Sequence, residues 1–345
     1  MGKIIINRLP VPTWRSLKAN YAEVDYEPEC AMPPSMILPE GMEPGFGENR
    51  CRIRTGCGEE LSRELDKVPW TKYVYNADKV LDDPLRLYFM FEEDERAGIR
   101  AEINVGAGAG LEVYVIYESF ENAKGIGAVQ LEINAAENSR VKVTQLIDVS
   151  DGMDFINDIG AKVGSDAQVE ITQVYLGGKN VFGGIYSALE GYRSVLRTDI
   201  GYKLDADRSL DINVVADHTG KRSESEINVR GVLSDKAKKV FRGTIDFKTG
   251  AREAKGAESE DVLLLNEEVV NKTIPLILCS EEDVEGSHGA SIGRLSDSSV
   301  FYMMSRGISY EKVYEIMAEA KLNTVIRKTD DEEMLHRIEK ALKRR

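Results

Sequence analysis

The stretch Gly164-Ser-Asp-Ala-Gln-Val169-Glu-Ile171 shows the pattern that governs the middle of this chain: a short polar turn leads into a strand of alternating apolar and polar residues. Such alternation is typical of a strand with one buried face. The pattern recurs, and the apolar residues that anchor its repeats are Leu111, Val141, Val169, Leu210 and Val240. These anchors are 30, 28, 41 and 30 positions apart, and other strands begin between them, which gives a step of about 12 to 18 residues.

A regular step with no helical segment between the strands predicts a β-solenoid, in which each coil buries one strand face and stacks on its neighbours. The Gly, Asn and Asp residues at the junctions are the residues that turns prefer. An antiparallel β-sandwich is the alternative, because it also consists of short, evenly spaced strands. The missing Asn-Gly hairpin turns favour the solenoid. We therefore expect a mainly β fold with a β-helix core over residues 85–295.

Two regions flank this core. Residues 1–84 are irregular and rich in proline, with short helices expected at 14–20 and 59–68. Residues 296–345 are helical in pattern: Ser296 and Ser309 are expected helix caps, Gly307 an expected helix end, and Thr329 with Glu332 a capping box. The expected apolar faces comprise Val300, Phe301 and Met304, then Val313, Ile316, Met317 and Ala320, then Met334, Leu335, Ile338 and Leu342. Such helices usually cover the end of a solenoid or bind a partner.

The composition excludes several classes of protein. The 345 residues include 45 Lys and Arg against 59 Asp and Glu, a net charge of −14, which argues against binding to nucleic acid or to acidic membranes. No apolar run is long enough for a signal peptide or a membrane span, so we expect a cytoplasmic protein. Four cysteines without CxxC spacing predict reduced thiols and neither a disulfide scaffold nor a zinc finger.

His288 is the histidine with the most promising surroundings. It lies in an acidic, glycine-bearing segment, Glu281 to Gly293, where an imidazole beside carboxylates can bind iron or zinc or transfer protons. A hydrogen-bonded loop histidine is the structural alternative, and a structural role is our interpretation of His218, in a polar turn, and of His336, on a charged helix. Cys279 is nine residues before His288 and is either a ligand or a small core residue.

Cys51 and Cys57 are the other candidate thiols. Arg50, Arg52 and Arg54 are close in sequence, and we expect these arginines to lower the thiol pKa values. The acidic residues 258–261 and 281–285 leave a carbohydrate-active enzyme as a further alternative. No P-loop, GxSxG or HExxH motif is present, so no catalytic residue is assigned.

The C-terminal third carries two segments with a family resemblance. Ser287-His288-Gly-Ala-Ser-Ile-Gly-Arg-Leu295, followed by Val300-Phe301-Tyr302-Met-Met-Ser305-Arg306-Gly307-Ile308, resembles the SufB/SufD family of iron–sulfur cluster assembly proteins, and in length the compact members of minimal systems. The resemblance implies a right-handed parallel β-helix that forms a dimer across the β-helix ends. It also implies that the C-terminal helices dock a SufC-type ABC ATPase and that a cluster forms at the dimer interface near His288.

The chain also departs from this family. Where the SufB branch has a reactive cysteine, the segment here reads Glu258-Ser-Glu260-Asp261, and Gly286 stands where the SufD branch often has cysteine. Candidate ligands beside His288 are therefore Cys279, Glu285, Cys51 and Cys57, and Phe301, Tyr302 and Arg306 are the candidate ATPase contacts.

The resemblance implies a non-enzymatic scaffold for a transient iron–sulfur cluster, of 4Fe–4S or 2Fe–2S type. No nucleotide would bind to this chain, because ATP hydrolysis would take place in the partner. The expected partners are the ATPase and either a second copy of this chain or a SufB/SufD paralogue. The alternative is a structural subunit that binds no cluster and only docks the ATPase.

Overall fold

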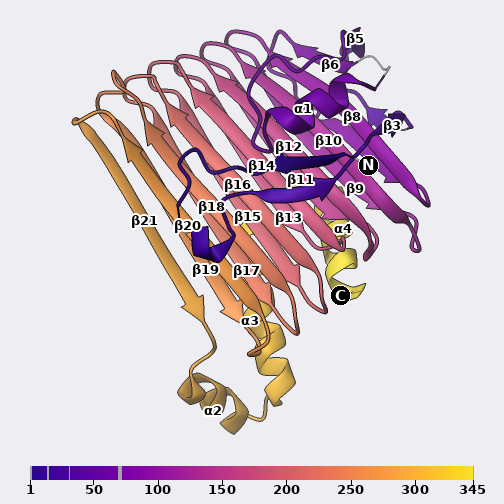
Figure 1. Ribbon diagram of the computed structural model, residues 1–345, viewed down its shortest axis with the longest axis vertical. Helices are drawn as coiled ribbons and strands as arrows, with labels where there is room; N and C mark the ends of the chain where they lie inside the picture. Colours follow the sequence, from indigo (N-terminus) through magenta and orange to yellow (C-terminus); the bar gives the residue numbers. More distant parts are fainter. Residues whose placement is uncertain (1, 14, 31, 69–71, 345) are drawn as a thin grey trace.

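A parallel β-solenoid forms the centre of the computed structural model, which describes residues 2–13, 15–30, 32–68 and 72–344 (Figure 1). Each coil gives one strand to each of two facing sheets. The first sheet holds β6 (Lys72–Ala77), β8 (Glu95–Val105), β10 (Lys124–Ala135), β12 (Gly152–Val163), β14 (Asn180–Leu189), β16 (Ser209–His218), β18 (Lys238–Phe247) and β20 (Val270–Cys279). The second sheet holds β7 (Leu85–Phe91), β9 (Gly110–Ser119), β11 (Arg140–Asp148), β13 (Gln168–Tyr175), β15 (Val195–Leu204), β17 (Glu224–Leu233), β19 (Ala254–Leu264) and β21 (Val284–Gly293).

The register of the strands confirms the expected parallel β-helix and excludes the sandwich. Val141 pairs in parallel with Leu111 on one side and with Val169 on the other, so three of the five anchors form one ladder. Leu210 lies in the first sheet instead, which explains the spacing of 41 residues. Val240 pairs with Asp211, one position past the Leu210 ladder, and faces outward.

Apolar side chains fill the space between the two sheets. Inward-facing Val, Ile, Leu, Phe and Ala residues of successive coils stack on one another and form one continuous buried core. The coils turn through residues with positive φ, among them Asn138 (56°), Asp166 (54°) and Asp235 (52°). Asn and Asp tolerate this left-handed conformation better than most residues, which explains the polar turn in each repeat.

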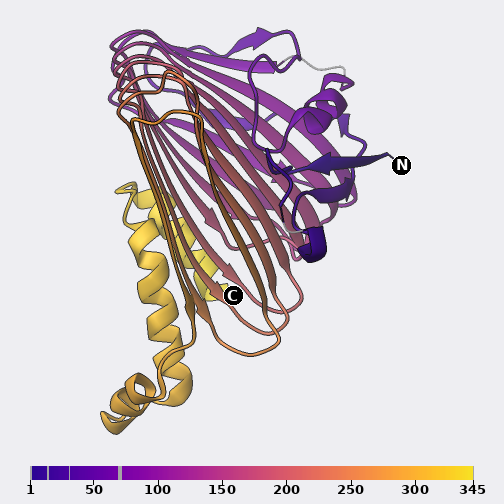
Figure 2. The same ribbon diagram turned by 60° about the vertical axis from the view of Figure 1, so that its left-hand side comes forward.

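The N-terminal region covers the outer face of the first sheet (Figure 2). It comprises β1 (Lys3–Ile6), a 3-10 turn at Arg15–Leu17, β2 (Ala22–Asp25), β3 (Glu29–Cys30), β4 (Ser35–Ile37), β5 (Gly45–Gly47) and α1 (Glu59–Asp66). The 3-10 turn replaces the helix expected at 14–20, of which Trp14 is outside the described residues. β6, which precedes the expected start of the core at residue 85, already pairs in parallel with β8.

Three helices follow the solenoid: α2 (Asp297–Ser305), α3 (Tyr310–Ile326) and α4 (Glu332–Arg344). The expected caps Ser296 and Ser309 are confirmed, since each side chain accepts a hydrogen bond from the first turn. The expected capping box is wrong: Asp331 caps α4 by accepting from the Met334 N–H at 2.8 Å. In the part of the chain that the structure describes, no helix is both long and apolar enough to cross a membrane.

Helices α3 and α4 pack along the outer face of the second sheet and not over the end of the solenoid (Figure 2). The reason is a row of outward-facing apolar residues on that sheet, including Tyr114, Leu146 and Val174, which these helices bury. The expected helix faces change accordingly. The buried residues of α3 are Val313, Ala318, Leu322, Val325 and Ile326, and Phe301 and Met304 of α2 are exposed.

Candidate functional site at the open end of the solenoid

The last coil of the solenoid has no neighbour on one side. Among the described strands, β20 pairs only with β18 and β21 only with β19, at one end of each sheet (Figure 1). At the other end β4 and β5 pair antiparallel with β7 and β6 and cover the first coil. Nearly every residue of β21 is exposed as a result. The interior of the solenoid therefore opens to the surface at β20 and β21.

His288 lies at this open end, on the inner face of β21. Gly286 faces the interior, because a Cβ added there would contact Phe247 and Ile277 of the first sheet. His288 is two residues further along the same strand and shares that face. In the register of the second sheet, His288 pairs with Glu258 of β19. The imidazole of the last coil therefore lies one rung above a carboxylate of the coil before it.

The side chain of Glu258 is almost completely buried in the interior, with 5% of its surface exposed. Its carboxylate lies over Gly243 on the opposite sheet, in space that a Cβ at that position would occupy. Burial, and next to it the charge of Glu260, raises the pKa of Glu258 to about 7, and Lys239 opposes this shift. The Glu258 carboxylate has no hydrogen bond or ion pair among the described residues.

A neighbouring ion pair is fully satisfied. Lys239 of β18 and Glu260 of β19 form an ion pair in which both side chains are completely buried. Thr273 of β20 connects them: its hydroxyl donates to Glu260 Oε2 at 2.6 Å and accepts from Lys239 Nζ at 3.1 Å. Burial lowers the pKa of Lys239 against the attraction of Glu260. The end of the interior thus contains one satisfied carboxylate, Glu260, and one unpartnered carboxylate, Glu258.

Lys239 and Thr273 were not among the residues expected at the site from the sequence. One signal for Lys239 was present, because the strand alternates as Lys239, Phe241, Gly243, Ile245 and Phe247. A lysine in a series of inward-facing apolar residues indicates a buried charge that needs a partner. The partner could not be identified, because Glu260 is on the facing sheet.

Cys279 and Glu285 do not join His288 in a preformed site. Cys279 is the last residue of β20, exposed at the turn, where its thiol donates to the Glu281 carbonyl at 3.0 Å. The contact between Gly286 and Ile277 separates this turn from His288. Glu285 points to the outer face of β21 and forms an ion pair with Lys255 at 3.0 Å.

Cys51 and Cys57 lie elsewhere, in the part of the N-terminal region that packs on the outer face of the first sheet. Cys57 packs against Gly184 of β14, which is three strands from β20, and its N–H donates to Asp158 Oδ1 at 2.7 Å. The Cys51 thiol donates to the Ile53 carbonyl at 3.0 Å. Both residues line a cavity of about 810 Å³.

The expectation that arginines lower the pKa values of these thiols is wrong. Burial, reinforced by Glu132, raises the pKa of Cys51 to about 11, and burial beside Asp158 raises the pKa of Cys57 well above its usual value. Desolvation and nearby carboxylates therefore outweigh the arginines that are close in sequence.

The candidate partner-binding residues lie on α2, which extends away from the solenoid and contacts α3 (Figures 1 and 2). Phe301 is 74% exposed and Tyr302 is 59% exposed. Arg306 stacks its guanidinium over the Tyr302 ring at 5.2 Å and donates to its hydroxyl at 3.2 Å. Aromatic and arginine side chains that are exposed together are typical of a protein-binding surface.

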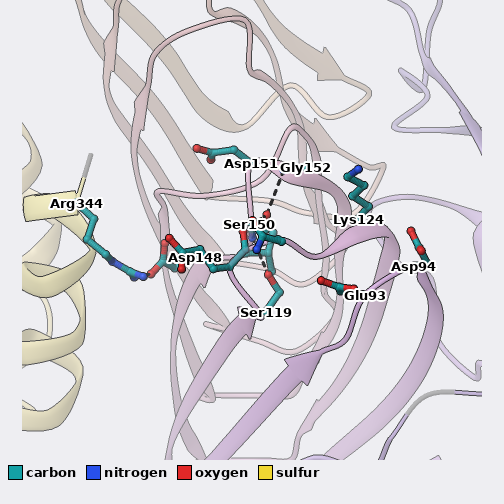
Figure 3. A pocket seen from close by; sticks show the side chains of 12 residues that line it. Glu93, Asp94, Ser119, Lys124, Asp148, Ser150, Asp151, Gly152 and Arg344 are labelled. Carbon is teal, nitrogen blue, oxygen red and sulfur yellow. Dashed lines mark hydrogen bonds and ion pairs between the residues drawn. The ribbon is translucent and has the colours of Figure 1, made fainter.

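A second cavity, of about 890 Å³, lies at the turns that precede β8, β10 and β12 (Figure 3). Five of its twelve lining residues are acidic, and Arg344 of α4 reaches its rim to pair with Asp148. Within residues 2–13, 15–30, 32–68 and 72–344, no three His, Cys, Asp or Glu side chains are arranged to hold a metal ion. A metal at the open end would therefore need ligands from outside this chain.

The family model and the relatives that match this chain belong to the same family. The family model described as "SUF system FeS cluster assembly, SufBD core domain" matches residues 89–321. The iron-sulfur cluster assembly protein SufD of Bacillus subtilis (strain 168) is 25% identical over 249 residues, 71% of this chain and 57% of the relative. A SufBD family protein of Pyrococcus horikoshii is 28% identical over 250 residues, 71% of this chain and 55% of the relative. The chain spans little more than half the length of these relatives.

Proposed function

Because this chain belongs to the SufBD core family, we propose that it is a cytoplasmic scaffold on which an iron–sulfur cluster is assembled at the open end of the solenoid. The observation that carries the proposal is the uncovered last coil, which presents the exposed imidazole of His288 above the interior. Imidazole is a ligand for iron, and it is available here because no further coil covers it. The iron and sulfide are cargo, and the chain itself catalyses no reaction.

A second copy of the chain is the proposed partner at this end. The outer edges of β20 and β21 carry backbone N–H and C=O groups that none of the described strands pairs. Such edges readily pair with another chain, and Val270 and Ile292 add exposed apolar surface. In a symmetric dimer two His288 side chains would approach one interface, where a cluster would also take ligands from the partner. A SufB/SufD paralogue could take the same place.

The SufC-type ATPase is the proposed partner of α2. Phe301, Tyr302 and Arg306 form an exposed surface on a helix that extends from the solenoid, so a partner can bind there without covering the last coil. ATP would bind to and be hydrolysed by that partner.

Cys279 is the thiol that the geometry favours as a further ligand. It is exposed in the last coil, whereas Cys57 is buried and Cys51 is partly covered under the N-terminal region. The raised pKa values of Cys51 and Cys57 keep both as thiols at neutral pH, and iron prefers thiolates.

The test is the iron and acid-labile sulfide content of the chain after anaerobic co-expression with the ATPase. We expect near-stoichiometric iron and sulfide in the wild type and their loss in His288→Ala. His336→Ala, which changes an exposed histidine on α4, is the matched control and should retain both. Equal retention by His288→Ala would refute the assignment of the site.

The alternative is a subunit that docks the ATPase and binds no cluster. This alternative is favoured because the described residues contain no group of three side chains arranged to bind a metal ion. A stable ATPase complex without iron in the wild type would support this alternative.

A further inference from the structure

We propose that Glu258 is a second protein ligand for the ferrous iron that binds at His288. Each chain would then contribute a half-site of one imidazole nitrogen and one carboxylate oxygen. The inference rests on the proposed function, because it adds a ligand to the same site. It replaces the expectation of a site that depends mainly on thiols.

The positions of the two side chains allow them to share one ion. Glu258 and His288 are paired residues on adjacent strands, so their backbones are about 4.8 Å apart. Both side chains are on the inner face, where residues of successive coils stack on one another. Metal–nitrogen and metal–oxygen bonds of about 2.1 Å, the length that zinc forms, can bridge two stacked side chains of this length. A single ion can therefore contact both without a change in the backbone.

Glu258 is the unpartnered carboxylate. The oxygens of Glu260 are occupied by Lys239 and Thr273, whereas those of Glu258 accept no hydrogen bond from the described residues. A carboxylate buried without a partner is costly, and a metal ion would remove that cost. Glu258 is also in the coil directly beneath the open last coil, so an ion that binds at His288 lies next to it.

Gly243 of β18 leaves room for the Glu258 carboxylate. Any side chain at this position would occupy the space of the Glu258 carboxylate. Glycine therefore lets the carboxylate stay inside the solenoid, below His288. Neither neighbouring inward position of the strand, Phe241 or Ile245, offers comparable room.

The donor set indicates the class of ligand. One imidazole and one carboxylate suit divalent first-row ions such as Fe²⁺, Mn²⁺ and Zn²⁺, and not Cu⁺, which prefers sulfur. Two protein ligands leave coordination positions open for sulfide, for water or for a second copy of the half-site. The ferrous ion would thus be held before the cluster is complete.

The test is anaerobic titration of the purified full-length chain with Fe²⁺, and with Co²⁺ as a spectroscopic probe. We expect Glu258→Gln and His288→Ala each to weaken Fe²⁺ binding at least tenfold and to change the Co²⁺ absorption bands. Glu285→Gln removes an acid from the outer face of the same coil and should bind within twofold of the wild type. Gly243→Ala keeps both ligands but displaces the carboxylate, and it should weaken binding as well.

The outcomes separate this inference from the proposed function. If Glu258→Gln is folded, as judged by circular dichroism, and binds Fe²⁺ like the wild type, the inference is wrong. Should that variant also retain iron and sulfide after co-expression while His288→Ala loses them, the proposed function stands without Glu258. Should neither variant lose iron, both proposals fail. If Glu258→Gln unfolds, Glu258→Asp is the variant to test, because it keeps a carboxylate but shortens the side chain. An Fe²⁺ affinity equal to that of the wild type would contradict the inference, and a weakened affinity would support it.

Discussion

His218 is an ionisable side chain that is buried in the interior in its neutral form. The ring is completely buried at the end of β16, and not in a polar turn as the sequence indicated. The Ser223 hydroxyl donates to the Gly220 carbonyl at 2.8 Å, so it must accept from the Nδ1–H of His218. Nε2 then accepts from the Ser225 hydroxyl at 2.8 Å. Both nitrogens of the neutral imidazole are satisfied, which supports a structural role.

This environment predicts a dependence of stability on pH. Burial lowers the pKa of His218 from 6.5 to about 4, so between these values the unfolded chain binds a proton that the folded chain does not. The free energy of unfolding should therefore fall as the pH decreases from 6.5 to 4, by about 3 kcal/mol for this group. Urea denaturation at several pH values would measure the slope.

His218→Gln is the comparison variant, because it cannot take up the proton. The difference in stability between the wild type and this variant should shrink as the pH falls. A difference that is constant from pH 7 to pH 4 would show that His218 is not held neutral.

Among the elements, the segment between β1 and β2 has a specific role at the last coils. Leu9 and Ala19 pack against Ile274 of β20 in a small buried cluster. Two side chains of the first sheet also bond to this segment: Lys272 donates to the Leu17 carbonyl at 2.8 Å and Arg242 donates to the Ala19 carbonyl at 2.5 Å. The segment therefore holds the outer face of β20, which has a strand neighbour on only one side.

Leu9→Asp should loosen this end of the solenoid. Burying a charge in the cluster costs several kcal/mol, so the segment should detach and amide exchange in β20 should accelerate at least tenfold. Exchange in β10, which is five strands from β20 in the same sheet, should change little. Hydrogen exchange with mass spectrometry would measure both strands.

Val11→Asp is the control, because Val11 belongs to the same segment but is exposed. It should leave the exchange of β20 unchanged. Equal protection of β20 in Leu9→Asp and the wild type would show that the last coil does not depend on this segment.

For the molecule as a whole, the two ends of the solenoid differ. β4 and β5 cover the first coil, whereas the last coil is open, and the lateral faces are covered by the N-terminal region and by α3 with α4 (Figure 2). Of the two ends of the described solenoid, the open end is thus the one where coils can continue into a second copy. This asymmetry also separates the proposed dimer surface from α2.

Light scattering should therefore give twice the mass of the chain for the wild type. Ile292→Lys places a charge at the open end and should yield the monomer, because the proposed interface would bury that charge. Phe301→Glu should remain a dimer and lose binding to the ATPase instead. A dimer that persists in Ile292→Lys would contradict association through the open end.

Much of the fold could be predicted because its signals are local. Alternation and polar turns lie within ten residues of one another, and they indicated the parallel solenoid; Ser296 and Ser309 similarly marked two helix starts. The assignment of strands to sheets was less accurate, since Leu210 and Val240 repeat the pattern but lie in another ladder. The spacing of the repeats does not indicate to which of the two sheets a strand belongs.

The candidate site was predicted only in part. His288 stood out in the sequence as one of three histidines, and it lies at the open end. The roles of Glu258 and Lys239 depend on residues far away in the chain. Glu258 lies next to His288 of the next coil, about 30 residues later, and Lys239 pairs with Glu260 on the facing sheet. The thiol pKa values were mispredicted for the same reason, since the carboxylates that raise them come from β10 and β12.

The amino-acid pattern was therefore sufficient for the coiled β architecture and the starts of α2 and α3, because backbone turns and strand alternation depend on neighbours in the chain. Stacking of the coils was needed to place an unpartnered carboxylate beneath His288, to bury Cys57 and to expose the last coil. Those features depend on contacts between residues far apart in sequence, where burial and the loss of hydration change the energy of a charge by more than any adjacent residue does.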